Sequence, residues 1–123
     1  MIYIIDGANF SNLEEFWNEI ERIFAYTIPN LDNYKRSFAG LRNLLSNLPK
    51  GSAVIWQNSR LSLKRLGYSE TVKLLRETQT NCHPSWSETI KKEIELAQLE
   101  LGETIFDSIV KIFVEESVAL RLE

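Results

Sequence analysis

Three short apolar runs constrain the fold of this chain more than any other feature of its sequence. They cover residues 2–5, 53–56 and 118–122. The first two are nearly continuous, which predicts buried strands, and the third alternates as a strand does. Apolar residues at helical spacing lie between the runs. Because strands separated by helices return in the same direction, the sequence predicts an α/β fold with a three-stranded parallel sheet packed against helices.

Helical periodicity is clear between the first two strands. A capping-box pattern at Ser11–Glu14 precedes a helix over residues 12–24. Asn30 can cap a second helix, whose apolar positions run from Leu31 to Leu48. Two helices are therefore predicted before the second strand.

Further helices are predicted between the second and third strands. Two cover residues 59–66 and 69–79. A second capping-box pattern at Ser85–Glu88 precedes a helix whose buried face would extend to Leu101, and the last helix begins at Thr104. The chain has 123 residues and no repeat or low-complexity tract, so residues 1–123 are expected to form a single domain.

Composition places the chain among ordinary globular proteins, with 44% hydrophobic and 25% charged residues. Cys82 is the single cysteine and cannot form an internal disulfide, which favours a reducing compartment. The apolar start at residues 1–5 is too short for a signal peptide or a membrane span. We therefore expect a cytoplasmic protein that does not associate with membranes.

Two kinds of binding chemistry have little support in the sequence. Cys82 and His83 are the only cysteine and the only histidine, too few for a zinc site, and a turn held by Pro84 explains the pair more simply. The basic stretch 60–76 lacks an aromatic series for stacking on bases, and the net charge is −3. No metal, no cofactor and no direct nucleic-acid partner are expected.

The segment Asp6–Asn9 after the first strand provides the strongest enzymatic alternative. It resembles the opening of PIN-like metal-dependent nucleases, in which an aspartate at the end of a strand helps to bind Mg²⁺. Such a site needs several converging carboxylates. The second strand instead runs into Gln57 and Asn58, and the remaining aspartates of the chain are Asp32 and Asp107. A plain turn at Asp6 is favoured, and the nuclease stays as an alternative.

Several short segments follow one another in an order typical of a known family: Ile5–Phe10, Asn30–Asp32, Trp56, Leu66–Tyr68, Cys82–Ser85 and Gly102–Asp107. This ordered set resembles the longer members of the barstar family of ribonuclease inhibitors. The resemblance implies a three-stranded parallel sheet packed with helices, and a protein that catalyses nothing but plugs a ribonuclease active site. Because such an active site holds phosphates with cations, an inhibitor can enter it with carboxylates framed by aromatic side chains.

In that family the contact surface is the second helix with the loop before it. Carried over to this chain, the resemblance implies an interface at Tyr26, Asn30, Asp32, Asn33 and Arg36, with Glu115 as a peripheral contact on the last helix. Four of them have a structural alternative. Tyr26 can pack on the first helix, Asn30 fits a helix cap, and Asp32 fits the first turn of a helix, where a carboxylate stabilises the dipole. Glu115 fits a solvated helix end.

Arg36 departs from the family pattern, which usually has a second carboxylate at this position. A cation that faces a phosphate-binding active site is repelled. Three explanations compete: a different target, a local shift of the alignment, or another contact surface such as the acidic C-terminal region. We expect a monomeric inhibitor of the immunity or antitoxin type, whose partner is a ribonuclease or related toxin. The alternatives are the PIN-like nuclease and an interaction module without a ribonuclease target.

Overall fold

The structure is a computed structural model that describes residues 1–24 and 36–123. Its elements, in chain order, are β1 (Ile2–Asp6), the 3₁₀ turn η1 (Gly7–Asn9), α1 (Leu13–Phe24), α2 (Phe38–Ser46), β2 (Ala53–Gln57), α3 (Ser59–Arg65), α4 (Tyr68–Asn81), the 3₁₀ turn η3 (Pro84–Trp86), α5 (Ser87–Gln98), α6 (Ile105–Glu115) and β3 (Ala119–Leu122). No helix within these ranges is long and apolar enough to cross a membrane.

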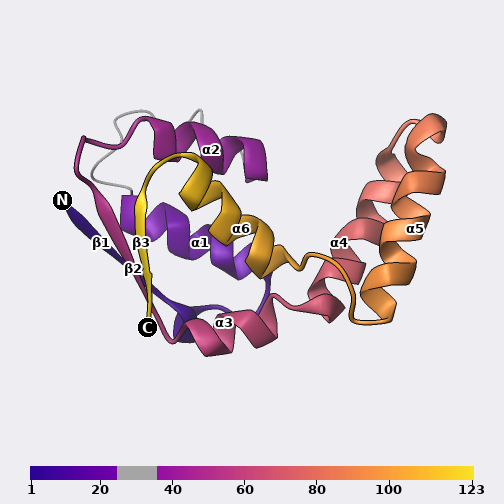
Figure 1. The fold of residues 1–123 in the computed structure, drawn as a ribbon, viewed down its shortest axis with the longest axis horizontal. Coiled ribbons are helices and arrows are strands. Elements are labelled where there is room, and N and C mark those ends of the chain that lie inside the picture. The colour runs from indigo at the N-terminus through magenta and orange to yellow at the C-terminus, as the bar shows by residue number, and fades with distance from the viewer. Residues whose placement is uncertain (25–35) are drawn as a thin grey trace.

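The three strands form one parallel sheet in the order β1-β2-β3, with β2 at the centre (Figure 1). Ile4 pairs with Ile55, and Ile55 pairs with Arg121. Each parallel neighbour is reached through intervening helices, as the order of elements along the chain requires. The predicted α/β fold with a three-stranded parallel sheet is confirmed.

Among the described elements, the helices cover one face of the sheet (Figure 1). Tyr3 and Ile5 are buried in the core that α1, α2 and α6 share, whereas the alternate residues Ile2 and Ile4 are 66% and 45% exposed. The prediction that the first strand is buried is therefore wrong for its outer face. A continuous apolar run is typical of a strand covered on both faces, but it does not show whether a second layer exists.

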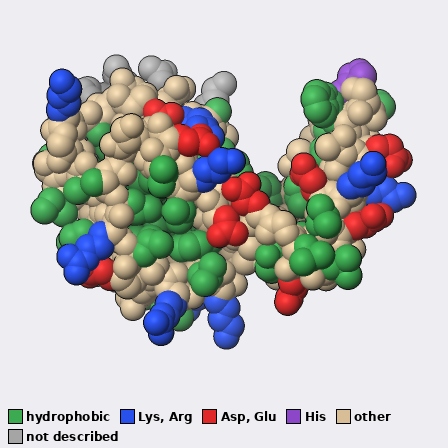
Figure 2. All heavy atoms as spheres, in the orientation of Figure 1, with side chains coloured by type: hydrophobic (Ala, Val, Ile, Leu, Met, Phe, Trp, Pro, Cys, Tyr) green, Lys and Arg blue, Asp and Glu red, His purple; other side chains and the backbone are tan. Residues whose placement is uncertain are grey.

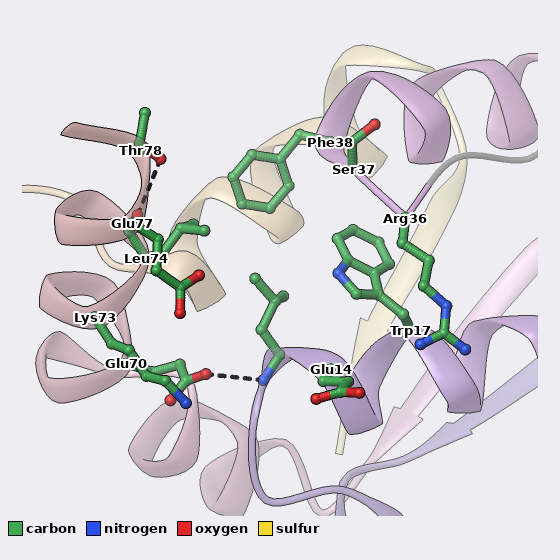
Figure 3. A pocket seen from close by; sticks show the side chains of 11 residues that line it. Glu14, Trp17, Arg36, Ser37, Phe38, Glu70, Lys73, Leu74, Glu77 and Thr78 are labelled. Carbon is green, nitrogen blue, oxygen red and sulfur yellow. Dashed lines mark hydrogen bonds between the residues drawn. The ribbon is translucent and has the colours of Figure 1, made fainter. Parts of the chain in front are cut away.

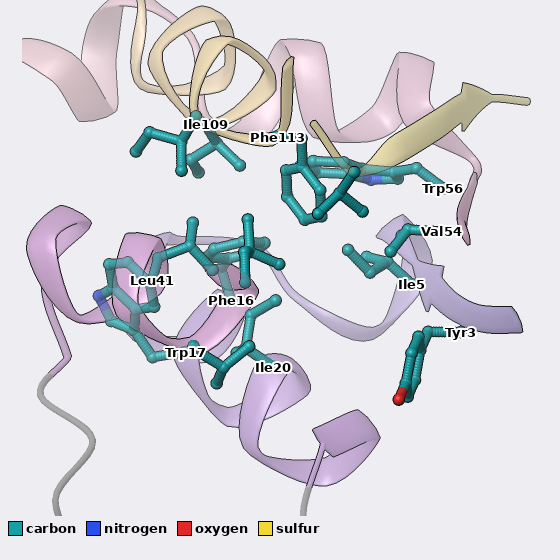
Figure 4. Close-up of a cluster of buried hydrophobic side chains, with 14 of the residues drawn as sticks. Tyr3, Ile5, Phe16, Trp17, Ile20, Leu41, Val54, Trp56, Ile109 and Phe113 are labelled. Carbon is teal, nitrogen blue, oxygen red and sulfur yellow. The ribbon is translucent and has the colours of Figure 1, made fainter. Parts of the chain in front are cut away.

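The core under the covered face is centred on Trp56, which has no exposed surface. The Trp56 ring stacks on Phe16 with centroids 5.8 Å apart, and Phe106 meets it edge-on at 5.2 Å. Side chains from β1, β2, α1, α2 and α6 converge on this cluster (Figure 4). Aromatic pairs at these distances add to the stability that burial alone supplies, so strands and helices are joined at one point.

The polar atom of Trp56 is satisfied inside the core. Its indole N–H donates to Ser62 Oγ at 2.9 Å, and Ser62 is fully buried in α3. Gly7 packs against the same hydroxyl, because a Cβ there would lie 2.4 Å from Ser62 Oγ and 2.5 Å from the Asn58 carbonyl oxygen. Only glycine allows the turn after β1 to approach α3 this closely.

Two parts of the molecule are distinct in Figures 1 and 2. The body contains β1–β3 with α1, α2, α3 and α6, and the hairpin, which contains α4, η3 and α5, stands away from it. Within the hairpin α4 packs against α5, whose buried residues are Ile90, Ile94 and Ala97. The first turn of α4 joins the parts, since Thr71 Oγ1 accepts a hydrogen bond from the Ile105 N–H of α6 at 3.0 Å.

The beginnings of two helices differ from the predictions. Asn12, not Ser11, caps α1, because Asn12 Oδ1 accepts from the Glu15 N–H at 2.8 Å. The prediction of a continuous helix after Asn30 is wrong at Ser37, because the backbone of Ser37 is extended. Ser37 instead caps α2, and its Oγ accepts a hydrogen bond from the Gly40 N–H. Serine and asparagine compete for the backbone wherever several stand close together, so the pattern allows more than one start.

The predicted limits of α5 are also wrong. Ser85 does not cap this helix, which begins at Ser87 without a side-chain cap, and His83 instead accepts from the Ser85 N–H in the preceding 3₁₀ turn. The helix ends at Gln98, so Leu101 lies beyond it and is 54% exposed. The predicted start of α6 at Thr104 is confirmed, and the structure shows a capping box there with both of its hydrogen bonds formed.

Candidate functional site

Four of the six residues that the resemblance placed at an interface lie outside the described residues: Tyr26, Asn30, Asp32 and Asn33. Arg36 and Glu115 are described. Arg36 immediately precedes the cap of α2, and Glu115 is the last residue of α6. The two contact different helices, Arg36 through Glu21 of α1 and Glu115 through Arg42 of α2.

Arg36 is held against α1. Its guanidinium donates through Nε to Glu21 Oε1 at 3.0 Å and through Nη2 to Glu21 Oε2 at 2.8 Å. A third bond goes from Nη2 to Asn18 Oδ1 at 2.6 Å. Such a two-pronged pair aligns the planar groups and neutralises the cation. The positive charge that departs from the family pattern is therefore balanced within the chain.

Glu115 joins α6 to α2. One of its carboxylate oxygens accepts a hydrogen bond from Arg42 Nη1, and the neighbouring Glu116 lies 3.9 Å from the same nitrogen. Both partners of the main pair are about two-fifths exposed. An exposed pair of this kind stabilises a fold only slightly. Arg36 and Arg42 thus fasten the start and the middle of α2 to its neighbours on both sides.

A cleft of about 550 Å³ lies between the hairpin and the body (Figure 3). Figure 2 shows the notch that separates the two parts. The cleft is lined from α1, from the start of α2 and from α4 by Leu13, Glu14, Trp17, Arg36, Ser37, Phe38, Glu70, Lys73, Leu74, Glu77 and Thr78. Its volume lies in the range of sites that hold ligands or side chains of partners.

The floor of the cleft is apolar. It consists of Leu13 and Trp17 from α1, Phe38 from the first turn of α2, and Leu74 from α4. The rings of Trp17 and Phe38 lie 6.2 Å apart between centroids, tilted by 58°. Leu13, Phe38 and Leu74 are only partly buried, so they leave apolar surface open to an incoming side chain.

Charged side chains surround this floor. Glu70, Lys73 and Glu77 share one side of α4, because residues three, four and seven apart lie on the same helix face. Glu14 lies on the opposite wall, in the first turn of α1. Glu70 also holds the walls together at the base, since its Oε1 accepts from the Leu13 N–H at 3.1 Å. The rim therefore has more carboxylates than unbalanced cations.

Asp6, the residue on which the nuclease alternative depends, lies at the carboxyl end of β1. Asp6 Oδ1 accepts from Asn58 Nδ2 and from the Ala8 N–H, each at 2.9 Å. The hydrogen bond from the Asn58 side chain, followed by that from the Ala8 N–H, lowers the pKa of Asp6 below its ordinary value. The Asp6 carboxylate thus links the turns that follow β1 and β2.

Glu19 holds the turn after β1 through hydrogen bonds with Asp6 and Asn9. Its side chain is 2% exposed, and it accepts hydrogen bonds from the Asp6 N–H at 2.9 Å, Asn9 Nδ2 at 3.0 Å and the Arg22 guanidinium. Burial alone would raise the pKa of Glu19, but the bonds from Arg22, Asp6 and Asn9 outweigh it and hold that pKa below its ordinary value. Glu19 is a buried carboxylate that hydrogen bonds from Asp6, Asn9 and Arg22 hold in place.

Neither of these carboxylates belongs to a larger ligand cluster. Across residues 1–24 and 36–123, no three His, Cys, Asp or Glu side chains come together in a way that could hold a metal ion. Cys82 is half-buried, and its thiol lies against the Gln79 carbonyl oxygen. His83 accepts from the Ser85 N–H, as expected for a turn that Pro84 holds.

Trp56 and Trp86 differ in exposure. Trp56 lies at the centre of the core, as predicted for the buried strand over residues 53–56. Trp86 is 62% exposed at the tip of the hairpin. Aromatic side chains are enriched at the centres of protein interfaces, so Trp86 remains available for a contact.

Sequence reasoning missed the cleft. The helical spacing of Glu70, Leu74 and Glu77 is consistent with one mixed face on α4, but no local pattern shows that this face lies opposite Leu13 and Phe38. The contact between Leu13 and Glu70 joins residues 57 positions apart in the chain. Comparisons with family models, with curated proteins and with solved structures found no match to this chain.

Proposed function

We propose that this chain binds another protein in a one-to-one complex and thereby blocks a ribonuclease or related toxin, as a cytoplasmic immunity or antitoxin protein does. The observation that carries the proposal is the cleft beside Arg36 and Phe38, with its apolar floor and its carboxylates. The barstar-like order of sequence segments implies an interface in this neighbourhood. The parallel three-stranded sheet is the fold that the same resemblance implies.

Charge complementarity supports a ribonuclease as the partner. Enzymes that hold RNA present cations and hydrogen-bond donors to phosphates, and carboxylates can occupy those positions. Glu14, Glu70 and Glu77 supply such groups at the cleft. The pairing of Arg36 with Glu21 supports the proposal as well, because a neutralised cation repels a basic partner far less than an isolated one.

The first test is capture of the partner from the source cells with the purified chain as bait, followed by an RNA-cleavage assay of the captured protein. We expect an activity that is absent from the complex, appears when the complex is dissociated, and disappears again when one equivalent of the chain is added back. A captured protein with neither nuclease nor toxin activity would refute the proposed function.

Substitutions then locate the contact surface. Glu14→Lys combined with Glu77→Lys should weaken binding to the captured protein at least tenfold, because it replaces attraction by repulsion. Glu93→Lys combined with Glu95→Lys makes the same charge change on exposed positions of α5 that do not line the cleft. This control should bind as the parent does. Equal losses in both variants would indicate that net charge alone matters.

The resemblance itself is tested separately. Tyr26→Ala and Asp32→Ala should each weaken binding to the captured protein if the family interface is retained. Unchanged binding of both would place the contact elsewhere. The nuclease alternative has a distinct signature: RNA cleavage by the purified chain that requires Mg²⁺ and is lost in Asp6→Asn.

A further inference from the structure

The floor of the cleft is suited to an apolar side chain. Leu13, Phe38 and Leu74 come from three different helices and are each partly uncovered, while the edge of Trp17 closes the space between them. Covering partly exposed apolar surface stabilises a complex by roughly 25 cal/mol per Å² removed from water. A concave apolar floor of about 550 Å³ therefore favours a side chain that inserts over a flat surface that merely rests on it.

The rim is suited to a cation beside that apolar side chain. Glu14 and Glu77 have no ion-pair partner within the described ranges, and Glu70 is bonded to a backbone N–H of the body. Two cations line the cleft, but Arg36 is balanced by Glu21, which leaves Lys73 against three carboxylates. The carboxylates stand on both walls, so a positive group in the mouth meets a negative group on either side.

The same charges disfavour other occupants. Phosphate groups of a nucleic acid would meet three carboxylates at the rim, and an acidic peptide would be repelled in the same way. Phe38, which is only partly buried, adds an aromatic ring against which a guanidinium or ammonium group can lie.

We propose that the cleft between α4 and the body binds a peptide segment in which an apolar side chain is flanked by lysine or arginine, and that this segment belongs to the partner protein. The apolar side chain covers Leu13, Phe38 and Leu74, and the flanking cations lie between Glu14 and Glu77. This inference rests on the proposed function in one respect, since it takes the cleft to be the contact surface for the partner.

The test is titration of the ¹⁵N-labelled chain with blocked pentapeptides, followed by the shifts of its amide and indole signals. The first peptide alternates lysine and leucine; in the second, glycine replaces leucine, and in the third, glutamate replaces lysine. We expect saturable shifts for the first peptide at Leu13, Trp17, Phe38 and Leu74, and at least tenfold weaker binding for the other two. Binding of the first peptide should weaken as salt is added.

A matched pair of variants gives the second readout. Glu14→Gln combined with Glu77→Gln should weaken binding of the lysine–leucine peptide about fivefold to tenfold, and Glu93→Gln combined with Glu95→Gln should leave it unchanged. Retained signal dispersion in both variants shows that the fold is intact. Equal binding of all three peptides, shifts confined to other surfaces, or no saturation at millimolar peptide would each overturn the inference.

The outcomes separate the two proposals. If the peptide binds in the cleft but the captured partner is neither a nuclease nor a toxin, the chemistry of the occupant stands and the ribonuclease target is wrong. If the chain inhibits a ribonuclease but no basic apolar peptide enters the cleft, the inhibitor acts through another surface and this inference alone is wrong.

Discussion

The body and the hairpin are built on different amounts of buried surface. In the body, Trp56 is enclosed by four aromatic side chains that come from α1, from α6 and from the turn after η1, and contacts across the sheet join distant parts of the chain. In the hairpin, Ile90, Ile94 and Ala97 are the buried residues of α5, and they lie outside the main core cluster. Two helices that cover each other along one face bury little apolar surface and are marginal by themselves.

This contrast has a consequence for the cleft, which has one wall in each part. The wall from α1 and α2 is anchored in the aromatic core, whereas the wall from α4 is fastened to the body mainly at its first turn, through Glu70 and Thr71. Elements with few buried contacts open at a lower free energy than the core of the same protein. We therefore expect the two walls to differ in stability, so that the α4 wall adjusts to a partner more readily.

The largest effects on the free energy of unfolding are expected from substitutions of buried residues in the body and in the hairpin. Trp56→Ala should lower the free energy of unfolding by about 3–5 kcal/mol and speed amide hydrogen exchange throughout the body. Ile94→Ala should cost about 2 kcal/mol and speed exchange over residues 68–98, with the strands still protected. Chemical denaturation and hydrogen exchange measure both. If Ile94→Ala speeds exchange in β1 and β2 as much as in the hairpin, the body and the hairpin unfold as one cooperative unit, which would contradict the expected difference in their stability.

The buried carboxylate of Glu19 tests the body alone. Glu19→Gln removes the charge that Asp6, Asn9 and Arg22 bond, and should cost about 1.5–3 kcal/mol at neutral pH. Because the pKa of Glu19 is lowered in the folded state, its stabilisation is present above the pKa of an unfolded glutamate, about 4.3. That stabilisation is lost as the pH falls through the lower folded pKa.

The measurement is the free energy of unfolding of the parent and of Glu19→Gln between neutral and strongly acid pH. The difference between them should shrink on acidification. Glu95→Gln, an exposed change on α5, serves as the control and should show no such trend. A difference that stays constant down to strongly acid pH would mean that the charge of Glu19 does not contribute.

Thr71, where the hairpin joins the body, tests how strongly the two parts are coupled. Thr71→Val keeps the shape of the side chain but leaves the Ile105 N–H without its acceptor, which should cost about 1–3 kcal/mol. We expect faster hydrogen exchange over α4 and the first turn of α6, with the strands unaffected. Thr80→Val, which removes only a bond to its own helix at an exposed position, is the control. Equal effects of the two would show that Thr71 does not fasten the hairpin.

The smallest effect is expected at the surface of the body. Arg42→Ala breaks the pairs with Glu115 and Glu116 and should change the free energy of unfolding by about 0.2–1 kcal/mol. A double-mutant cycle with Glu115→Ala measures the coupling directly. A coupling well above this range would mean that α2 depends on its ion pairs and not mainly on the burial of Leu41, Leu44 and Leu45.

Much of the fold could be predicted because its signals are local. The apolar runs located β1, β2 and β3, the helical spacing located α1 and α3, and Thr104–Asp107 indicated the cap of α6. The predictions that were wrong concern places where local signals compete. Serine and asparagine near a helix start offer alternative caps, and the turn after Gln98 ends α5 before its apolar pattern does.

The candidate site could not be predicted in the same way. The interface residues Tyr26, Asn30, Asp32 and Asn33 came from a resemblance and lie outside the described residues, so they stay predictions. Arg36 was recognised in the sequence as a departure from the family pattern, but its pairing with Glu21 on another helix could not be predicted from the sequence.

By itself, the sequence determined which segments become strands and helices, and it determined that the strands run parallel, because apolar periodicity and the alternation of elements are properties of neighbouring residues. Tertiary structure alone decided that Ile2 and Ile4 on one face of the sheet stay exposed, that Glu21 neutralises Arg36, and that Glu70 of α4 meets Leu13 beside a cleft. These features depend on contacts between residues that are far apart in the chain, and no local sequence pattern predicts such contacts.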